Sequence, residues 1–322
     1  MKRRAFLALL GGAGFASRAV GQGTGRVYRL GVLSPIGRAF EVFRARSLPE
    51  LARHGFVEGA NLSVVYRSGA EPELPRLAHE LLDFSPDAIL AIAVSAARTI
   101  RQTTSTIPTV LYGGEDAISE GLAGTLSRPG GNVTGVVILA TSLNGKRIQL
   151  LHEVIPTMRR VAVLLFSRSP VLDEQQRDVQ AAAADAGLDL IIALAEGPAD
   201  YGAAFRHTRE RGAQALVIGA NAQFYANAEL LLDHAREAGL PTACEWANMA
   251  QLGCLLGYGP NRDILYRTVG QKLAQVLQGV PPASIPIERP AIFELAVNLK
   301  AARSLGIEVP SSILASADEV IE

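Results

Sequence analysis

The chain has 322 residues, with 31 basic and 31 acidic side chains and no formal net charge at pH 7. This balance excludes the strongly basic surface that is typical of nucleic-acid-binding proteins. After an export signal about 300 residues remain, which exceeds one ordinary domain and suits two. Beyond the N-terminus no segment offers about 18 uninterrupted apolar residues, so we expect no membrane span.

The N-terminus predicts export. Arg3-Arg4 is followed by Ala5-Phe6-Leu7, as in the core of a twin-arginine signal, and an apolar stretch then continues to Ala16. That stretch is too short and too interrupted by glycine to span a bilayer as a helix, so a cleaved signal peptide is favoured over an anchor. We expect residues 1–25 to be removed and the mature protein to be free in the periplasm, because no cysteine follows the apolar run to carry a lipid.

From Arg29 to Leu139 short apolar runs alternate with longer amphipathic segments. Short apolar runs are typical of buried parallel strands, and apolar residues spaced by three and four are typical of helices. The predicted strands are 29–34, 62–67, 87–94, 108–112 and 133–139, and the predicted helices are 39–54, 74–84, 95–104 and 115–126.

The same alternation recurs from Arg160 to Gly257 and then becomes less regular. The predicted strands are 160–166, 190–195, 215–219, 242–245, 254–257 and 294–299. The predicted helices are 143–155, 173–186, 201–211, 221–238, 263–278 and 301–305.

This alternation predicts an α/β fold of two doubly wound parallel-sheet lobes, each with helices on both faces. We expect one lobe to comprise 26–141 plus 254–285 and the other to comprise 142–253 plus 286–322. The crossings between lobes are expected at 140–144, 246–253 and 285–293. Three crossings form a hinge that is stiff in twist and soft in bending, as domain closure requires.

The only cysteines, Cys244 and Cys254, lie ten residues apart. They either form a disulfide in an oxidising compartment or are two small buried residues on neighbouring strands. We prefer the second alternative, because pairing requires Cα atoms within about 7 Å of each other.

In open α/β sheets, ligands bind beyond the carboxyl ends of the strands. This rule selects residues from both lobes that are expected to face each other across a cleft. The candidate ligand-binding residues are Ser34, Ser95, Ala96, Tyr112, Asp116, Ser167, Asn221, Glu245 and Trp246.

Several candidates also have a structural alternative. Ser95 and Asn221 either bind the ligand or cap the helices that they begin. Asp116 either accepts a ligand ammonium or hydroxyl group or complements a helix dipole. Tyr112 and Trp246 either stack on a flat ligand or pack in the lobe and hinge.

Glu245 is either a ligand acceptor or a hinge hydrogen-bonding group. Arg168, at another strand end, is expected to be a solvated charge on the rim.

The sequence contains none of the common catalytic or nucleotide-binding motifs. It has no phosphate-binding loop, no Gly-x-Gly-x-x-Gly between a strand and a helix, no His-Glu-x-x-His and no Gly-x-Ser-x-Gly. All five histidines fall in predicted helices away from the strand ends. We therefore expect no enzyme activity, no cofactor and no metal.

Four segments resemble a known family in the same order along nearly all of the mature chain. They are GFVEGANL at 55–62, SRPGGNVTG at 127–135, FELAVNLKAARSLG at 293–306 and LASADEVIE at 314–322. These segments resemble the substrate-binding proteins of ABC transporters that are related to tryptophan- and tyrosine-binding receptors.

The resemblance implies a type I periplasmic binding protein fold, capture of a small solute, and delivery to permease subunits in the inner membrane. It implies no catalytic residues, and its motifs identify the fold rather than the ligand. Three positions depart from the family pattern, namely Val94-Ser95, Asp116-Ala117 and Asn221-Ala222. The tryptophan-binding subfamily tends to have Asp-Asn where Asn221-Ala222 stands, and a desolvated ammonium needs an anionic partner. The absence of this acid argues against an amino-acid ligand unless Asp116 or Glu245 replaces it.

Three functions remain open. A solute receptor is the preferred one, with a ligand-sensing subunit and an enzyme on a doubly wound fold as alternatives. Trp246, Tyr112 and the uncharged strand ends favour an amino acid or an aromatic carboxylate as the ligand.

Overall fold

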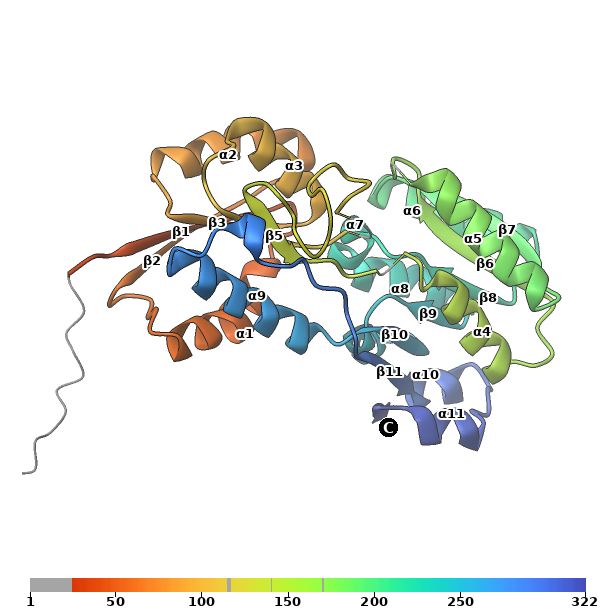
Figure 1. Ribbon diagram of the computed structural model, residues 1–322. Coiled ribbons are helices and arrows are strands. Elements are labelled where there is room, and N and C mark those ends of the chain that lie inside the picture. Colours follow the sequence, from red (N-terminus) through yellow and green to blue (C-terminus); the bar gives the residue numbers. More distant parts are fainter. Residues whose placement is uncertain (1–24, 115–116, 140, 170) are drawn as a thin grey trace, which may run out of the picture.

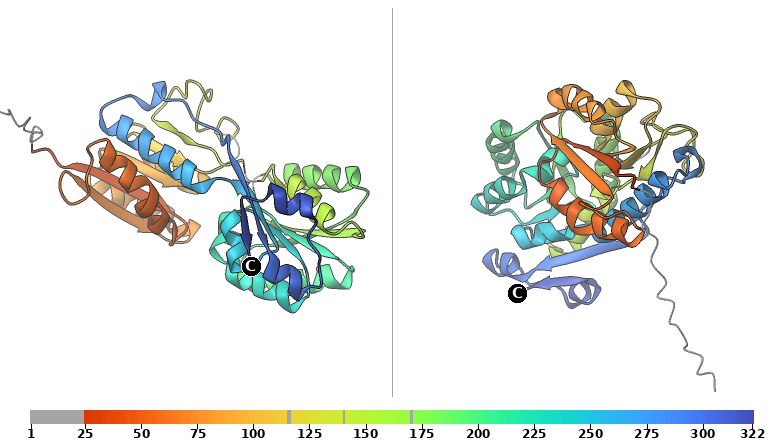
Figure 2. Two further views of the ribbon diagram at one scale, coloured as in Figure 1. Left: turned by 90° about the horizontal axis from the view of Figure 1, so that it is seen from below. Right: turned by 90° about the vertical axis from the view of Figure 1, so that its left-hand side faces the viewer.

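The computed structural model describes residues 25–114, 117–139, 141–169 and 171–322. It forms two α/β lobes joined by a narrow waist (Figures 1 and 2). Each lobe has its own sheet, of five strands in the first and seven in the second. The predicted signal peptide falls almost entirely outside the described residues. Among the described helices, none is both long enough and apolar enough to cross a bilayer.

The first lobe is a parallel sheet with the strand order β2-β1-β3-β4-β5. Its strands are β1 (Tyr28–Ser34), β2 (Leu62–Ser68), β3 (Ala88–Ile92), β4 (Thr109–Tyr112) and β5 (Val133–Val136). One face is covered by α1 (Ala39–Arg53) and α9 (Arg262–Leu277). The other face is covered by α2 (Leu74–Asp83) and α3 (Val94–Thr103).

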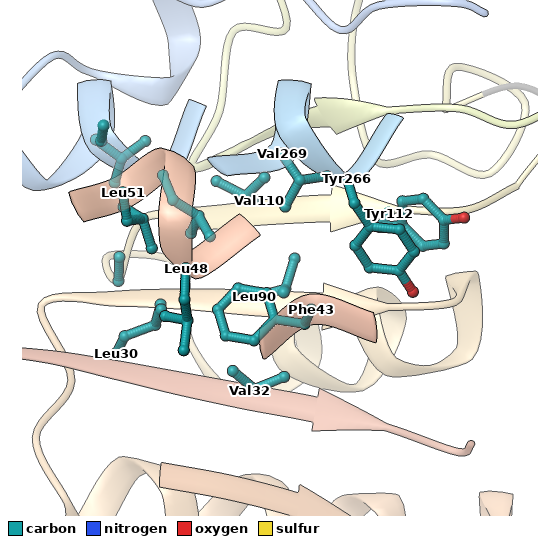
Figure 3. Packing of buried hydrophobic residues seen from close by; sticks show 14 of the residues in the cluster. Leu30, Val32, Phe43, Leu48, Leu51, Leu90, Val110, Tyr112, Tyr266 and Val269 are labelled. Carbon is teal, nitrogen blue, oxygen red and sulfur yellow. The ribbon is translucent and has the colours of Figure 1, made fainter. Parts of the chain in front are cut away.

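Side-chain alternation along the strands divides the core of this lobe into two layers. Leu30 and Val32 of β1 pack against α1 and α9, whereas Leu33 packs against α2 and α3. Figure 3 shows the first layer, which ends at Tyr112 and Tyr266 near the waist. Both faces of the sheet are therefore buried, which explains why its strands are nearly continuous apolar runs.

The second lobe has the strand order β12-β11-β10-β9-β8-β6-β7. Its strands are β6 (Arg160–Phe166), β7 (Asp189–Ala195), β8 (Ala215–Ile218), β9 (Thr242–Cys244), β10 (Leu256–Pro260), β11 (Phe293–Asn298) and β12 (Glu319–Ile321). β10 and β11 pair antiparallel, and all other pairings are parallel.

Helices again cover both faces of the second sheet. One face carries α4 (Asn144–Val154), α5 (Leu172–Asp185), α10 (Leu299–Ser304) and α11 (Ser311–Ser316). The other face carries α6 (Pro198–Glu210), α7 (Ala222–Ala226), α8 (Ala228–Glu237) and the 3₁₀ helix η2 (Ala247–Leu252).

The predicted elements and the structure differ in several places. The helix expected at 115–126 is wrong, since residues 117–126 form turns in which Gly121 has a left-handed φ of 67°. The helix expected at 221–238 is interrupted at Asn227, whose side-chain amide donates to the carbonyl of Gln223. The short elements α11 and β12 had no periodic pattern long enough to predict them.

Along the described chain the lobes are joined before α4, between β10 and α9, and before β11. The expected second crossing at 246–253 is wrong, because η2 packs within the second lobe. The assignment of 254–260 to the first lobe is corrected as well, since β10 pairs with β9 and β11. The crossing lies instead at Asn261, where β10 ends and α9 begins.

Cys244 and Cys254 form a disulfide, with their Cα atoms 6.5 Å apart, so our preference for two unpaired cysteines is corrected. The bond joins the end of β9 to the residues before β10. It closes a short loop that contains Glu245, Trp246 and η2, and therefore limits the conformations available to that loop.

We expect the double substitution Cys244→Ala/Cys254→Ala to lower the free energy of unfolding by about 2–3 kcal/mol, because a loop of this length gains entropy in the unfolded chain when it is opened. Urea denaturation measures the change. A reductant should bring the wild type to the level of the variant and leave the variant unaffected. Equal stability of the two proteins without reductant would contradict this.

Candidate functional site

A cavity of ≈ 350 Å³ lies between the lobes, where the carboxyl ends of the strands of both sheets meet. This volume is within the range of small-molecule sites. The first lobe and its crossings contribute Ile36, Arg38, Ala39, Val42, Glu71, Ile92, Ala93, Val94, Ser95, Arg98, Tyr112, Gly113, Gly114, Glu120, Ile138, Thr141, Arg262 and Tyr266. The second lobe contributes Phe166, Arg168, Ser169, Val171, Gln175, Ala220, Asn221, Ala222, Tyr225, Glu245 and Trp246.

The cavity brings together five of the residues that the sequence selected. They are Ser95, Tyr112, Asn221, Glu245 and Trp246. Asp116 lies outside the described residues. The ligand-binding role of the five remains a prediction, but their meeting in one cavity is what the strand-end rule requires.

Ser34, Ala96 and Ser167 do not line the cavity. The Ser34 hydroxyl is buried and exchanges hydrogen bonds with the backbone of Ile36, which closes the turn after β1. Ala96 belongs to the core between α3 and the sheet, because it lies on the buried face of the helix. The rule selects strand ends correctly, but only some residues at each end reach the cleft.

Ser95 lies in the first turn of α3 and does not cap this helix, so its structural alternative is wrong. The N-cap residue is Ala93, with a φ of 78° and no side-chain capping bond. Such a backbone conformation is costly for a residue with a Cβ and is found mostly at functional sites. Ala93, Val94 and Ser95 line the cavity, so the first amide groups of α3 and the Ser95 hydroxyl are potential donors to a ligand.

Asn221 has the capping role that was its alternative. Its Oδ1 accepts a hydrogen bond of 2.8 Å from the backbone N–H of Gln223, at the start of α7. The side chain still lines the cavity, so its amide NH₂ group can donate to a ligand.

An aromatic cluster forms the inner wall of the cavity. The rings of Tyr112 and Tyr266 stack with centroids 4.3 Å apart (Figure 3), and the rings of Tyr225 and Trp246 meet edge to face at 6.5 Å. Trp246 is only 4% exposed. The cluster joins β4 and α9 of the first lobe to α7 and the β9–η2 connection of the second.

Arg262, the first residue of α9, lies within this cluster. Its guanidinium carbon is 4.7 Å from the centroid of the Tyr225 ring and 5.3 Å from that of Trp246, and both contacts are cation–π interactions. Nη1 donates hydrogen bonds to the Tyr225 hydroxyl and to Asn248 Oδ1. Its Nε is buried and has no hydrogen-bond partner among the described residues.

The pKa shifts in this cluster leave Tyr112 and Tyr266 neutral and Arg262 positively charged at physiological pH. Burial raises the pKa of Tyr112 to about 12, although nearby Arg262 lowers it in part, so Tyr112 is a neutral phenol at physiological pH. Burial also raises the pKa of Tyr266 well above its ordinary value. Burial acts to lower the pKa of Arg262, but the surrounding tyrosines raise it overall, and the guanidinium stays protonated.

Arg147 of α4 is fully buried and holds backbone segments next to the cavity in place. It donates to the carbonyl oxygens of Tyr258, at 2.9 Å, and of Glu245, at 3.2 Å, and to Asn144 Oδ1 at 2.7 Å. These bonds fix the backbone at Glu245, next to Trp246. They also tie β10 to the connection that follows β9.

The sequence analysis missed Arg262, Tyr225 and Tyr266. The signal for Arg262 was present, since it follows the carboxyl end of β10 and obeys the strand-end rule. The prediction ended that strand at Gly257 and placed it in the first lobe, so the rule was not applied there. Tyr266 follows Arg262 by one helical turn and therefore lies on the same face of α9.

No group of three or more histidine, cysteine, aspartate or glutamate side chains among the described residues could hold a metal ion. None of the five histidines lines the cavity.

We expect Arg147→Met to lower the free energy of unfolding by about 3 kcal/mol, because it leaves the buried carbonyl oxygens of Glu245 and Tyr258 without their charged donor. Chemical denaturation measures the loss. Arg159→Met is a matched control, since Arg159 is exposed and, among the described residues, its side chain donates only to the neighbouring carbonyl of Met158. Equal stabilities of the two variants would contradict the role assigned to Arg147.

Comparison with known sequences places this architecture among transport proteins. The sequence profile of the ABC transporter substrate binding protein family matches residues 49–321. A tyrosine-binding protein of Clostridioides difficile is 25% identical over 126 residues, which is 38% of this chain. The matched segment spans 36% of the length of that relative.

Solved structures share the fold over most of the chain. A conserved domain protein of Vibrio cholerae has a TM-score of 0.84 at 23% identity, covering 92% of this chain and all of that one. An ABC domain from Streptococcus pneumonia, in complex with L-Trp, has a TM-score of 0.83 at 21% identity with the same coverage.

Proposed function

Because the chain belongs to the family of ABC transporter substrate-binding proteins, we propose that it is the periplasmic solute-binding component of an ABC importer. The observation that carries the proposal is the cavity between the lobes, to which both lobes contribute at the carboxyl ends of their strands. A solute in this position touches both sheets, so its binding favours the closed arrangement of the lobes.

The proposed location rests on two independent features. The N-terminal sequence has the order of charges, apolar residues and small residues of a twin-arginine signal. The disulfide between Cys244 and Cys254 suits an oxidising compartment such as the periplasm. In this function the partners are the permease subunits in the inner membrane, to which the loaded protein delivers its solute.

The proposed ligand is an amino acid or an aromatic carboxylate. The relatives described above include a tyrosine-binding protein and a domain in complex with L-Trp. The cavity combines apolar side chains with the rings of Tyr225 and Trp246. The polar donors at the start of α3 suit an acidic group on the ligand, and so does the Arg262 cation.

The other two functions make different predictions. An enzyme would convert a bound solute, and the described cavity contains no histidine and no metal-binding group to do so. A sensor subunit would bind a solute equally well but would be encoded apart from permease and ATPase genes. Incubation of the protein with each ligand found below, followed by analysis of products, tests the first of these.

A thermal-shift screen over amino acids, aromatic carboxylates and sugars tests the proposed function. A ligand present at 100 times its dissociation constant adds about 2.7 kcal/mol to the free energy of unfolding, which shifts the melting temperature measurably. We expect at least one acid in the first two classes to stabilise the protein. No stabilisation by any member of the three classes would count against solute binding.

We expect Trp246→Ala to weaken binding of that ligand by more than about 1 kcal/mol, because the indole ring forms part of the cavity wall and supports the Arg262 guanidinium. Titration calorimetry measures the change. Trp246→Phe keeps a ring at this position and should recover part of the loss. An affinity that is unchanged in a folded Trp246→Ala protein would refute this role.

A further inference from the structure

Four arginines line the cavity, and they differ in whether their charge is neutralised. Arg38 pairs with Glu229 at 3.4 Å, Arg168 pairs with Glu196 at 2.8 Å, and Arg98 pairs with Glu120. Each of these three guanidinium groups therefore has a carboxylate in contact. A ligand anion would have to compete with that carboxylate.

Arg262 has no such partner among the residues that the structure describes. Within the described part of the chain, no carboxylate oxygen lies within 4.0 Å of its guanidinium nitrogens, and its neighbours are neutral hydroxyl, amide and aromatic groups. The buried Nε–H has no acceptor in the same part of the chain. A buried donor without an acceptor is costly, and more so when it carries charge.

The surroundings of Arg262 orient it for an anion. Nη1 is held by Tyr225 and Asn248 from one side, and the Tyr225 and Trp246 rings fix the guanidinium plane. No described residue accepts a hydrogen bond from Nε, so the edge that carries Nε is the one that a further acceptor would use. A carboxylate matches a guanidinium edge with two parallel hydrogen bonds, which a neutral oxygen does not.

We propose that Arg262 is the anion anchor of this receptor and that its ligand carries a carboxylate, bound at the crossing between β10 and α9. The inference rests on the proposed solute-binding function and makes it more specific. The apolar side chains of Ile36, Val42, Val94 and Phe166 in the same cavity then accommodate the rest of the ligand.

Paired probes test the anchor directly. 3-Phenylpropanoate and L-phenylalanine carry a carboxylate, and 3-phenylpropanamide and L-phenylalaninamide differ from them only in that group. The pair whose acid stabilises the protein in the thermal-shift screen is then titrated by calorimetry. We expect the wild type to bind the acid at least about 10-fold more tightly than the amide.

Substitutions at Arg262 should remove that preference. We expect Arg262→Met to weaken binding of the acid by about 100-fold and to change binding of the amide little. Arg262→Lys keeps the charge but loses the planar fork, and should recover part of the affinity. Arg267→Met is the matched control, because Arg267 is exposed on the same helix and does not line the cavity.

Five results would overturn the anchor. Equal binding of acid and amide by the wild type removes the anion requirement. An equal loss of both in Arg262→Met assigns the residue a structural role only. A loss of the acid preference in Ser95→Ala, with Arg262→Met retaining it, moves the anion to the start of α3. Stabilisation by sugars or amides alone refutes Arg262 as the anchor while the receptor function stands, whereas no stabilisation at all refutes both.

Discussion

The site depends on how closely β10 approaches the connection after β9. A Cβ atom at Gly259 would lie 2.0 Å from the carbonyl oxygen of Glu245, so only glycine permits this contact. Arg147 then holds both segments by their carbonyl oxygens. The close approach puts the end of β10 beside Trp246, and the next residues of the chain cross to the first lobe. Backbone packing thus places Arg262 near Trp246, and its long side chain then reaches the indole ring.

The composition of the aromatic cluster suggests stacking on a flat ligand, but its rings pack against one another and against the Arg262 guanidinium. Tyr112 and Tyr266 stack on each other, and Trp246 has little exposed surface and carries a guanidinium over its ring. The rings thus keep a cation in a site from which most water is excluded, and cation–π contacts offset part of its desolvation. Lysine would fit this site less well, since its compact ammonium is hydrated more strongly and lacks a planar face. The rings that form the apolar wall of the cavity are thus the same rings that hold the positive charge of Arg262 in place.

Much of the fold could be predicted from the sequence, because strongly periodic segments have few alternatives. Strands such as β1 and β6 were predicted to within a residue or two, and the strand ends brought five of nine selected residues to one cavity. The failures have local causes. Gly121 adopts a left-handed φ where the apolar pattern indicated a helix. The predicted strand at 254–257 ended too early, because Gly257 and Gly259 leave no apolar pattern over the last residues of β10, which are defined by their pairing with β11. The disulfide was undecidable, since spacing does not determine the distance between two Cα atoms.

The position of Arg262 also separates affinity from closure. Arg262 lies at a crossing between the lobes, and groups near a hinge move little when the lobes rotate about it. In the role proposed for Arg262, an anion bound there would keep its hydrogen bonds as the lobes rotate, so this contact would raise affinity without favouring the closed state. Ser95 and Asn221 belong to different lobes, and both line the cavity. On the proposed function, a ligand that reaches both of them would bind the closed state more tightly than one that reaches Arg262 alone. The length of the ligand beyond its acidic group would then determine whether a bound solute closes the protein.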